Sequence, residues 1–466
     1  MTAVAASNTI TTVDPATATK LADYSTHDPA AIDAALDRAK EAWATWRFTS
    51  SSERATLMKA LAASLRFHKS DLALLATREM GKTIVEAEAE IEKCAVCCDY
   101  YAAHGAAALA DEHVSTNASE SYVAFRPLGV LLAIMPWNFP YWQAFRALVP
   151  AMLAGNVVVL KHAANVTGCA LAIERVVREA GFPGAAFTTL VVASHDMEAI
   201  VADARIAAVT LTGSEAAGSA VAAMAGRHLK KTVLELGGSD AFIVLADADV
   251  DAAAAMAVKA RFQNNGQSCI AAKRFIVEAP VYDAFLEAFV AHTRELRIGD
   301  PAERATQLGP LAREDLREAL EAQVTRSRQR GARLATGGAR GDRPGYYYAP
   351  TILADVVPGM AVFDEETFGP AAAVIRARDL NHCITLANAS PYGLGGNLWS
   401  CDIERAKSLA SRLESGAVFI NGMTASDPRL PFGGVKKSGY GRELSSYGMR
   451  EFVNVQTVWI GPAHNR

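Results

Sequence analysis

The chain has 466 residues, of which 51% are hydrophobic and 21% charged, and its formal net charge is −4. That length exceeds one ordinary core, so we expect two or three domains. The small net charge excludes a global field that could hold nucleic acid or an anionic membrane, and a small-molecule ligand is therefore expected.

The sequence shows neither a recognisable targeting segment nor the regular cysteine spacing of a disulfide-rich protein. The first twenty residues do not match a signal peptide, and no later run is apolar for long enough to span a membrane, which predicts a cytoplasmic protein. Seven cysteines without regular spacing argue against a disulfide framework. Cys94 and Cys97 have no second Cys or His pair nearby, so they predict helix packing and no metal site.

The first predicted elements are helices. Residues 29–110 are rich in Ala, Leu, Glu and Lys with apolar residues at helical spacing. Residues 120–137 alternate before becoming continuously apolar, which predicts an exposed strand that leads into a buried one. Short apolar runs then alternate with Ala-rich helical stretches up to residue 238, which predicts a parallel, doubly wound sheet.

The same alternation returns after residue 270 and predicts a second α/β domain. Four segments are predicted strands there, namely 273–278, 346–355, 371–377 and 416–422. The tail, 450–461, alternates as a final strand that can pair with the earlier exposed strand or with another subunit.

Cys269 differs from the other cysteines because the polar, turn-forming run 263–268 precedes it and an apolar strand follows. This position predicts a thiol at the end of an element, where a nucleophile can meet a substrate. A small buried hydrophobe is the alternative. Glu235 ends an apolar strand before two glycines, so its carboxylate is a candidate base at the carboxyl edge of a parallel sheet, with a solvated strand-end Glu as the alternative.

Asn138 lies between Pro136 and Pro140, at the point where an apolar strand stops. The two prolines fix the backbone around one amide, which makes Asn138 a candidate oxyanion donor, with a turn-forming Asn as the alternative. No G-x-G-x-x-G follows a predicted strand. Gly213 and Ser214 nevertheless open a helix after a strand, and Lys161 ends another strand, which are weak indications of a phosphate site.

Seven motifs in this order resemble those of the aldehyde dehydrogenase superfamily: PWNFP, VLK, TGS, LELGG, NNGQSC, EETFGP and PFGGVKKSGYGRE. The resemblance covers nearly the whole chain. It implies two doubly wound parallel-sheet domains and a β-ribbon. The implied dinucleotide-binding domain comprises 1–110 and 128–237, the oligomerisation ribbon 111–127 and 451–466, and the catalytic domain 238–450.

The resemblance also implies roles for single residues. Cys269 attacks an aldehyde, Asn138 and the Cys269 backbone N–H hold the oxyanion, and Glu235 activates the water that hydrolyses the resulting thioester. The implied cofactor is NADP or NAD. The cofactor-binding positions are Trp137, Lys161, Ala164, Gly213, Ser214, Glu366 and Phe368.

The cofactor preference depends on position 164. Many NAD-preferring relatives carry a Glu there, which repels a 2′-phosphate, and this chain has Ala164. Lys161 could therefore meet a phosphate, which favours NADP, with NAD as the alternative.

Arg146 and Ser426 match the positions that bind the substrate carboxylate in succinate semialdehyde dehydrogenases, which predicts an aldehyde with a distal carboxylate. The stretches NNGQSCIAAKRF and GAVFINGMTASDPRLPFGG most resemble a bacterial and cyanobacterial branch of these enzymes. Trp142 and Phe432 are expected to line the same mouth. A structural ion pair is the alternative role for Arg146. Many of these relatives carry a second arginine where this chain has Gln263, so glutarate semialdehyde or an uncharged short aldehyde remains an alternative substrate.

Two other functions remain as alternatives. The chain could be a silent binding protein of the same fold or a thiol hydrolase without a cofactor. Ala271 replaces the partner cysteine of a regulatory disulfide found in some relatives, so that switch is excluded. The expected partners are a small-molecule aldehyde and further copies of the chain, as a homodimer or homotetramer, with neither nucleic acid nor membrane.

Overall fold

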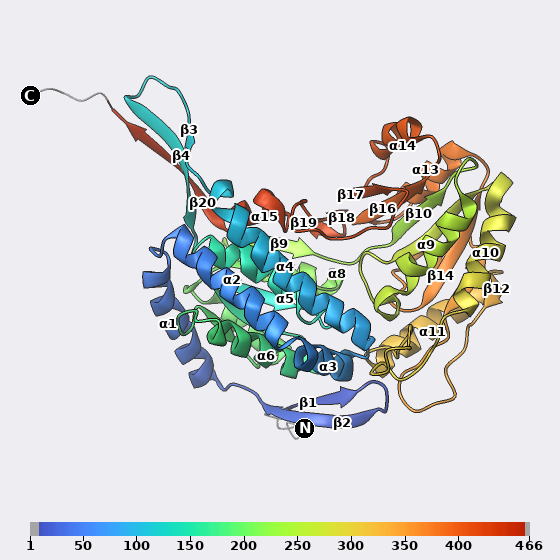
Figure 1. The fold of residues 1–466 in the computed structure, drawn as a ribbon, viewed down its shortest axis with the longest axis horizontal. Coiled ribbons are helices and arrows are strands. Elements are labelled where there is room, and N and C mark those ends of the chain that lie inside the picture. The colour runs from blue at the N-terminus through green and yellow to red at the C-terminus, as the bar shows by residue number, and fades with distance from the viewer. Residues whose placement is uncertain (1–8, 462–466) are drawn as a thin grey trace, which may run out of the picture.

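The computed structural model describes residues 9–461 and consists of two α/β bodies and a projecting ribbon (Figure 1). Each body has a mainly parallel sheet between helices, so the predicted fold class is confirmed. Residues 1–8 of the predicted dinucleotide-binding domain and residues 462–466 of the predicted ribbon lie outside the described residues. The functional assignment of the two bodies stays a prediction.

The first body is built on a six-stranded sheet with the order β19-β9-β8-β5-β6-β7, in which all pairs are parallel except β19 with β9. The strands are β5 (Val130–Met135), β6 (Val157–His162), β7 (Phe187–Thr189), β8 (Ile206–Thr212), β9 (Lys231–Glu235) and β19 (Gly439–Tyr440). Continuous apolar runs form the inner strands because helices cover both faces of the sheet.

The helices of this body include the predicted helical stretches. They are α1 (Pro29–Trp46), α2 (Ser51–Phe67), α3 (Lys69–Met80), α4 (Ile84–Ala108), α5 (Trp142–Leu153), α6 (Thr167–Glu179), α7 (Met197–Ala202), α8 (Glu215–Arg227) and α15 (Ser445–Glu451). The last of them, α15, was not predicted. Local sequence fixes several starts. Ser50 and Glu53, for example, form a capping box at the start of α2.

The second body is built on a seven-stranded sheet with the order β12-β13-β14-β11-β10-β16-β17. Its strands are β10 (Asp240–Val244), β11 (Ala272–Glu278), β12 (Arg333–Thr336), β13 (Thr351–Ala354), β14 (Ala371–Ala377), β16 (Gly395–Trp399) and β17 (Ala417–Ile420). Its helices are α9 (Val250–Phe262), α10 (Tyr282–Arg294), α11 (Glu314–Gln329), α12 (Ala361–Asp364), α13 (Leu380–Asn388) and α14 (Ile403–Ala410).

Three strands of this sheet were not among the predicted strands: β12 and the neighbouring strands β10 and β16. β10 follows the glycine pair of LELGG after one serine, and β16 itself begins with two glycines, which is typical of a turn. Both strands are completely buried, so burial on both faces of the sheet outweighs the local glycine signal.

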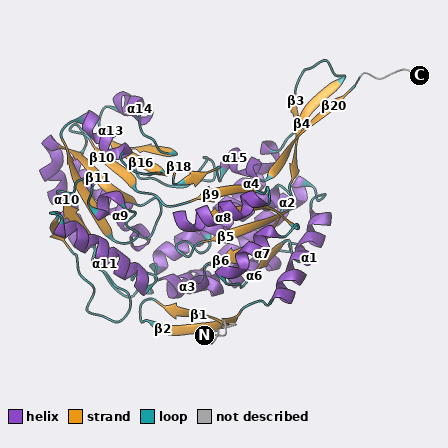
Figure 2. Ribbon diagram, turned by 180° about the vertical axis from the view of Figure 1, so that it is seen from behind, coloured by secondary structure: helices purple, strands orange, loops and turns teal. Residues whose placement is uncertain are grey.

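The ribbon consists of β3 (Glu112–His113), β4 (Glu120–Pro127) and β20 (Val453–Ile460), and it projects from the first body in both views (Figures 1 and 2). β20 pairs antiparallel with β4 along its whole length, so pairing with the earlier exposed strand, one of the two predicted alternatives, occurs within this chain. No helix in the described part of the chain is long and apolar enough to cross a membrane.

The remaining strands form two short antiparallel pairs: β1 (Thr9–Asp14) with β2 (Thr19–Ser25), and β15 (Tyr392–Gly393) with β18 (Val435–Lys436). The first pair lies below the helices of the first body in Figure 1 and was not predicted. Its sequence is polar and its side chains are exposed or half-exposed except for Thr12, so the sequence shows no clear alternation of apolar and polar residues.

Candidate active site

Cys269 follows a turn with three consecutive residues in the left-handed region. Asn264 has φ 53°, Asn265 φ 57° and Gly266 φ 74°. Asparagine tolerates this conformation better than most residues, and glycine has no side chain to oppose it. A Cβ on Gly266 would also collide with the backbone of Gly369. The sequence NNG therefore dictates the turn that presents Cys269 before β11.

Buried polar side chains hold this loop. Asn264 Nδ2 donates to the Asn138 carbonyl at 2.7 Å and to the Gln267 carbonyl at 3.0 Å. Asn265 Nδ2 donates to the carbonyls of Gly81 and Pro310. Because the carbonyls of Asn138, Gly81 and Pro310 belong to distant segments, tertiary contacts fix the loop, a role that its turn-forming sequence alone does not reveal.

Lys273 supports the loop from the other side. Its Nζ donates to the Cys269 carbonyl at 2.8 Å and also to the carbonyls of Ser268 and Ala271. The same ammonium lies 3.6 Å from the carboxylate of Glu366. The sequence analysis did not single out Lys273, because a lysine at the start of a strand gives no signal of full burial.

Asn138 lies beside the cysteine loop. It follows β5, is buried, and donates from Nδ2 to the Gln267 carbonyl at 3.0 Å. An amide nitrogen carries two N–H bonds, so a second one remains for a ligand. The structure thus brings Asn138 to the loop of Cys269, and its role as an oxyanion donor stays a prediction.

Glu235 ends β9, and the glycines after it permit close approach of the two bodies. A Cβ on Gly238 would lie 2.7 Å from the Cys269 carbonyl oxygen, and one on Gly237 would collide with Glu366. The Gly238 N–H donates to Glu366 Oε1 at 3.0 Å. Glycine at position 238 is therefore required by packing between the strand end and the backbone of the cysteine loop.

The Glu235 carboxylate itself is buried, and within residues 9–461 neither oxygen has a hydrogen-bond partner. Burial raises its pKa well above the usual value, and the nearby Glu443 adds to the rise, while Arg146 and Arg442 oppose it. Glu235 is not one of the side chains that line the pocket around Cys269. Its function as a base stays a prediction.

A pocket of about 210 Å³ opens in front of Cys269. The four residues predicted to bind the substrate all line this pocket together with the cysteine, and they are Trp142, Arg146, Ser426 and Phe432. Lys93 of α4 and Gln263 also line it. Residues from both bodies therefore converge on one cavity, which was not visible from any single motif.

The Cys269 thiol is half-buried, and burial raises its pKa to about 11. Arg146 and Lys273 oppose this rise because a nearby positive charge favours the thiolate. In the ligand-free protein the thiol is thus the main form at neutral pH.

Arg146 is fully buried and forms an ion pair with Glu443. Its guanidinium also lies 4.4 Å from the ring centre of Phe432, and Nη2 donates to Thr212 Oγ1 at 3.3 Å. The structural ion pair considered from the sequence is therefore present. Since Arg146 also lines the pocket, its role toward a substrate stays a prediction.

The predicted cofactor residues lie along the edge of the first sheet and across from it. Ser214 caps α8 by accepting from the Ala217 N–H at 3.3 Å. Trp137 contacts Phe368 with ring centres 5.7 Å apart, which joins the segment after β5 to the segment before β14. These contacts place the predicted residues on both bodies, and their cofactor roles stay predictions.

The surroundings of Lys161 show whether the predicted cofactor residues are suited to an anionic nucleotide. Its ammonium has neither a hydrogen-bond nor a carboxylate partner in the described part of the chain, and burial lowers its pKa. Ala164 begins the short 3₁₀ helix η1 (Ala164–Val166) and brings no charge. A partly buried cation without such a partner in residues 9–461 fits an anionic group such as a phosphate.

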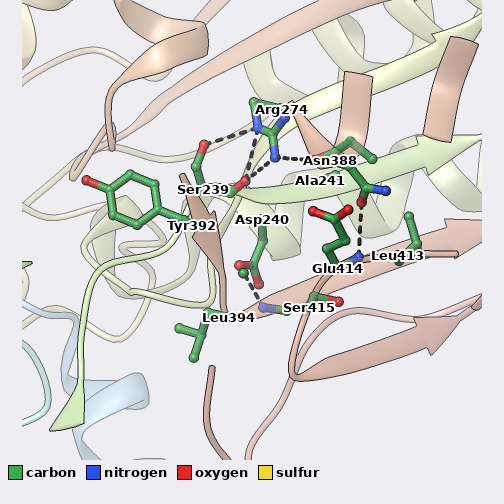
Figure 3. Close-up of a pocket in the computed structure, with 14 residues that line it drawn as sticks. Ser239, Asp240, Ala241, Arg274, Asn388, Tyr392, Leu394, Leu413, Glu414 and Ser415 are labelled. Carbon is green, nitrogen blue, oxygen red and sulfur yellow. Dashed lines mark hydrogen bonds between the residues drawn. The ribbon is translucent and has the colours of Figure 1, made fainter. Parts of the chain in front are cut away.

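A second cavity, of about 20 Å³, lies behind β10 (Figure 3). Arg274 fills one side and donates to the carbonyls of Ser239, Leu386 and Ala387. Asp240 accepts from the Gly395 N–H at 3.0 Å, and burial raises its pKa to about 6. The cavity has room for about one water molecule, so it is not a substrate site.

Comparison with known proteins gives the same family throughout the chain. The model described as "Aldehyde dehydrogenase family" matches residues 3–458. A curated relative from Mycobacterium tuberculosis strain H37Rv, named as an NADP(+) succinate-semialdehyde dehydrogenase, is 50% identical over 97% of this chain and 99% of its own length. A relative from Synechocystis, named as a probable NADP(+) succinate-semialdehyde dehydrogenase, is 49% identical over 97% of this chain and 99% of its own.

A solved structure is similarly close. Succinic semialdehyde dehydrogenase from Streptococcus pyogenes in complex with NADP+ superposes with a TM-score of 0.95 at 37% identity, covering 97% of this chain and 100% of that one. The similarity therefore extends to the arrangement of both bodies and the ribbon.

Proposed function

Because the chain belongs to the aldehyde dehydrogenase family, as its motifs predicted, we propose that it oxidises succinate semialdehyde to succinate with NADP through a covalent intermediate on Cys269. The substrate assignment is supported by the composition of the pocket in front of Cys269. Its lining includes Cys269 and, besides aromatic walls, the cationic side chains of Lys93 and Arg146 and the hydroxyl of Ser426. A reactive thiol and cationic groups in one cavity suit an aldehyde with a distal carboxylate.

The covalent route follows from the chemistry of an aldehyde, which has no leaving group except hydride. The Cys269 thiolate adds to the carbonyl carbon, and the Asn138 side chain donates to the oxygen that becomes negative. NADP supplies the hydride acceptor when bound. A thioester to Cys269 remains, and a water attacks it while Glu235 takes the proton from that water.

The buried position of Glu235 supports its role as a base. Because burial and Glu443 raise its pKa, the ionised carboxylate is a stronger proton acceptor than an exposed one. Release of succinate then returns Cys269 to its thiol form.

NADP is the proposed cofactor because Lys161 is a cation without a carboxylate partner in the described range 9–461, and position 164 carries no carboxylate. Lys161 would hold the 2′-phosphate, and Ser214 and the amino end of α8 would hold the pyrophosphate. The names of the two relatives and the NADP+ complex of the S. pyogenes enzyme support the same choice.

We also propose that the chain forms a homodimer or homotetramer through its ribbon. β20 is an edge strand of the described ribbon sheet, and its apolar side chains Val455, Trp459 and Ile460 are exposed. An exposed apolar edge strand is suited to pairing with a second copy.

The test is the absorbance at 340 nm of purified protein with succinate semialdehyde or butyraldehyde, each with NADP or NAD. We expect the fastest reduction with succinate semialdehyde and NADP. Cys269→Ala should remove all oxidation but retain NADP binding, measured by thermal stabilisation. Faster oxidation of butyraldehyde would discard the substrate assignment, and silence with every aldehyde would favour a binding protein.

A further inference from the structure

Lys93 is a cation of the Cys269 pocket that none of the sequence motifs identified. It lies in α4, whose amino end contacts the second body through the Ile84 N–H and the Pro301 carbonyl (Figure 1). The Lys93 ammonium donates to Ser426 Oγ at 2.8 Å, although 333 residues separate the two, and lies 4.3 Å from the Trp142 ring centre. The Lys93 side chain therefore extends from α4 to the wall of the pocket, where it contacts Ser426 and Trp142.

The carboxylates near Lys93 already have other partners. Glu90, one turn earlier on α4, is paired with Lys82 and accepts the backbone N–H groups of Tyr141 and Trp142 at 2.8 Å. Asp427 accepts from the guanidinium of Arg429.

Glu86, two turns earlier, lines the pocket but accepts the Asn264 N–H at 2.7 Å. Cys94 and Cys97, the remaining titratable neighbours on α4, have pKa values raised by burial and are neutral. Within residues 9–461, Lys93 thus has no ion-pair partner of its own.

The other cation of the pocket is already neutralised. Arg146 is paired with Glu443 and fixed against Phe432, so its charge is largely compensated before any ligand enters. The positive charge that remains for an incoming anion is on Lys93.

Lys93 and its neighbour Ser426 also keep hydrogen-bond donors that are not used within the described part of the chain. Lys93 uses one ammonium hydrogen on Ser426 and has two more. Ser426 Oγ accepts from both Lys93 and Trp142 Nε1, the latter at 3.0 Å, so its own hydrogen is left to donate. These free donors, on one wall of the cavity, match the oxygens of one carboxylate.

We propose that Lys93, together with Ser426, binds the distal carboxylate of the substrate and so selects acidic aldehydes; this inference rests on the proposed function. Lys93 supplies from α4 the charge that many succinate semialdehyde dehydrogenases take from a second arginine, where this chain has Gln263. Arg146 then acts mainly by holding Glu443 and the Phe432 wall in place.

The pKa of Lys93 is lowered to about 8, mainly by burial and in part by the positive charge of Arg146. The carboxylate of Glu90 acts in the opposite direction. An ammonium that titrates near this pH loses its attraction for a carboxylate in mildly alkaline solution. The selectivity for acidic aldehydes should therefore depend on pH.

The test compares Lys93→Met, Lys93→Arg and wild type by the ratio of kcat/KM for succinate semialdehyde to kcat/KM for butyraldehyde, with saturating NADP. Loss of a charge-assisted contact should reduce this ratio by about 10- to 100-fold in Lys93→Met, mainly through KM. Lys93→Arg should retain most of the ratio. Lys59→Met, which removes an exposed lysine of α2, is the matched control and should keep the wild-type ratio.

A pH series adds a readout that a structural role would not change. In wild type the ratio should fall above about pH 8, because only the acidic aldehyde needs the Lys93 charge, while titration of Cys269 affects both substrates and cancels. In Lys93→Met the ratio should be independent of pH.

Two failures can be told apart. If wild type itself does not prefer succinate semialdehyde, the proposed function is wrong and the role of Lys93 falls with it. If wild type prefers it and folded Lys93→Met keeps the preference and its pH dependence, only the role of Lys93 is overturned.

Discussion

At the scale of single residues, the site shows how burial controls charge. Cys269, Glu235 and Lys93 all have pKa values shifted toward their neutral forms, and burial is the first cause in each case. Arg146 and Glu443 are both buried and form an ion pair. Near neutral pH the free protein thus holds Cys269 mainly as the thiol, whereas Lys93 keeps most of its positive charge until the pH approaches about 8.

The state of Cys269 gives a prediction for the free protein. Because its pKa is raised to about 11, the thiolate fraction, and with it the rate of alkylation by iodoacetamide, should rise about tenfold per pH unit between about pH 7 and 9. Mass spectrometry of the peptide that contains Cys269 measures the rate and separates it from labelling of the exposed Cys401. A plateau below pH 8 would mean that the thiolate already dominates at neutral pH.

At the scale of elements, the site depends on segments that lie between helices and strands. The turn at 264–266 forms the short 3₁₀ element η3 (Gln263–Gly266) between α9 and β11, and three left-handed residues in it aim the cysteine. Its hydrogen bonds reach Asn138, Gly81 and Pro310, so the turn is locked by both bodies.

The requirement for glycine in this turn can be tested by replacing Gly266 with alanine and using a second glycine, Gly226, as the control. Gly266→Ala places a methyl group against the Gly369 backbone at a positive φ, so we expect a loss of about 1–3 kcal/mol, a Tm lower by several degrees, and a large fall in kcat. Gly226→Ala in α8 meets no atom within 4 Å and should keep activity and raise stability by up to about 1 kcal/mol. Differential scanning fluorimetry and the 340 nm assay measure both, and an unchanged Gly266→Ala protein would contradict the packing argument.

At the scale of the whole molecule, the ribbon extends away from both bodies (Figure 2). The bodies meet at the cysteine loop, where Asn138, which follows β5, donates to the Gln267 carbonyl. Val455 and Trp459 remain 60% and 52% exposed on β20. Apolar side chains on an edge strand are rarely left exposed in this way by a monomer.

The oligomer prediction follows from that surface. The double change Val455→Glu with Trp459→Glu places two like charges at the proposed contact, so the mass by light scattering after size exclusion should fall toward that of the monomer. Phe67→Glu, which changes an 83% exposed side chain away from the ribbon, should leave the mass unchanged. A double variant that keeps the wild-type mass would place the interface elsewhere.

The sequence by itself determined much of this protein. The alternation of apolar runs and helical stretches predicted both sheets because strand and helix periods are local properties. The ordered motifs predicted the family, and glycines such as Gly238 and Gly266 stood in the motifs where the backbone approaches closely. The four predicted substrate residues do meet around Cys269.

Only the tertiary structure decided which charges face one another. Arg146 acquires Glu443 as its partner, and β16 becomes a buried inner strand despite its glycines. Among residues 9–461, Lys93 has no ion-pair partner. The reason is physical: an ion pair or a sheet position depends on the free energy of burial beside segments far away in sequence. A local pattern reports the period of an element but not its neighbours.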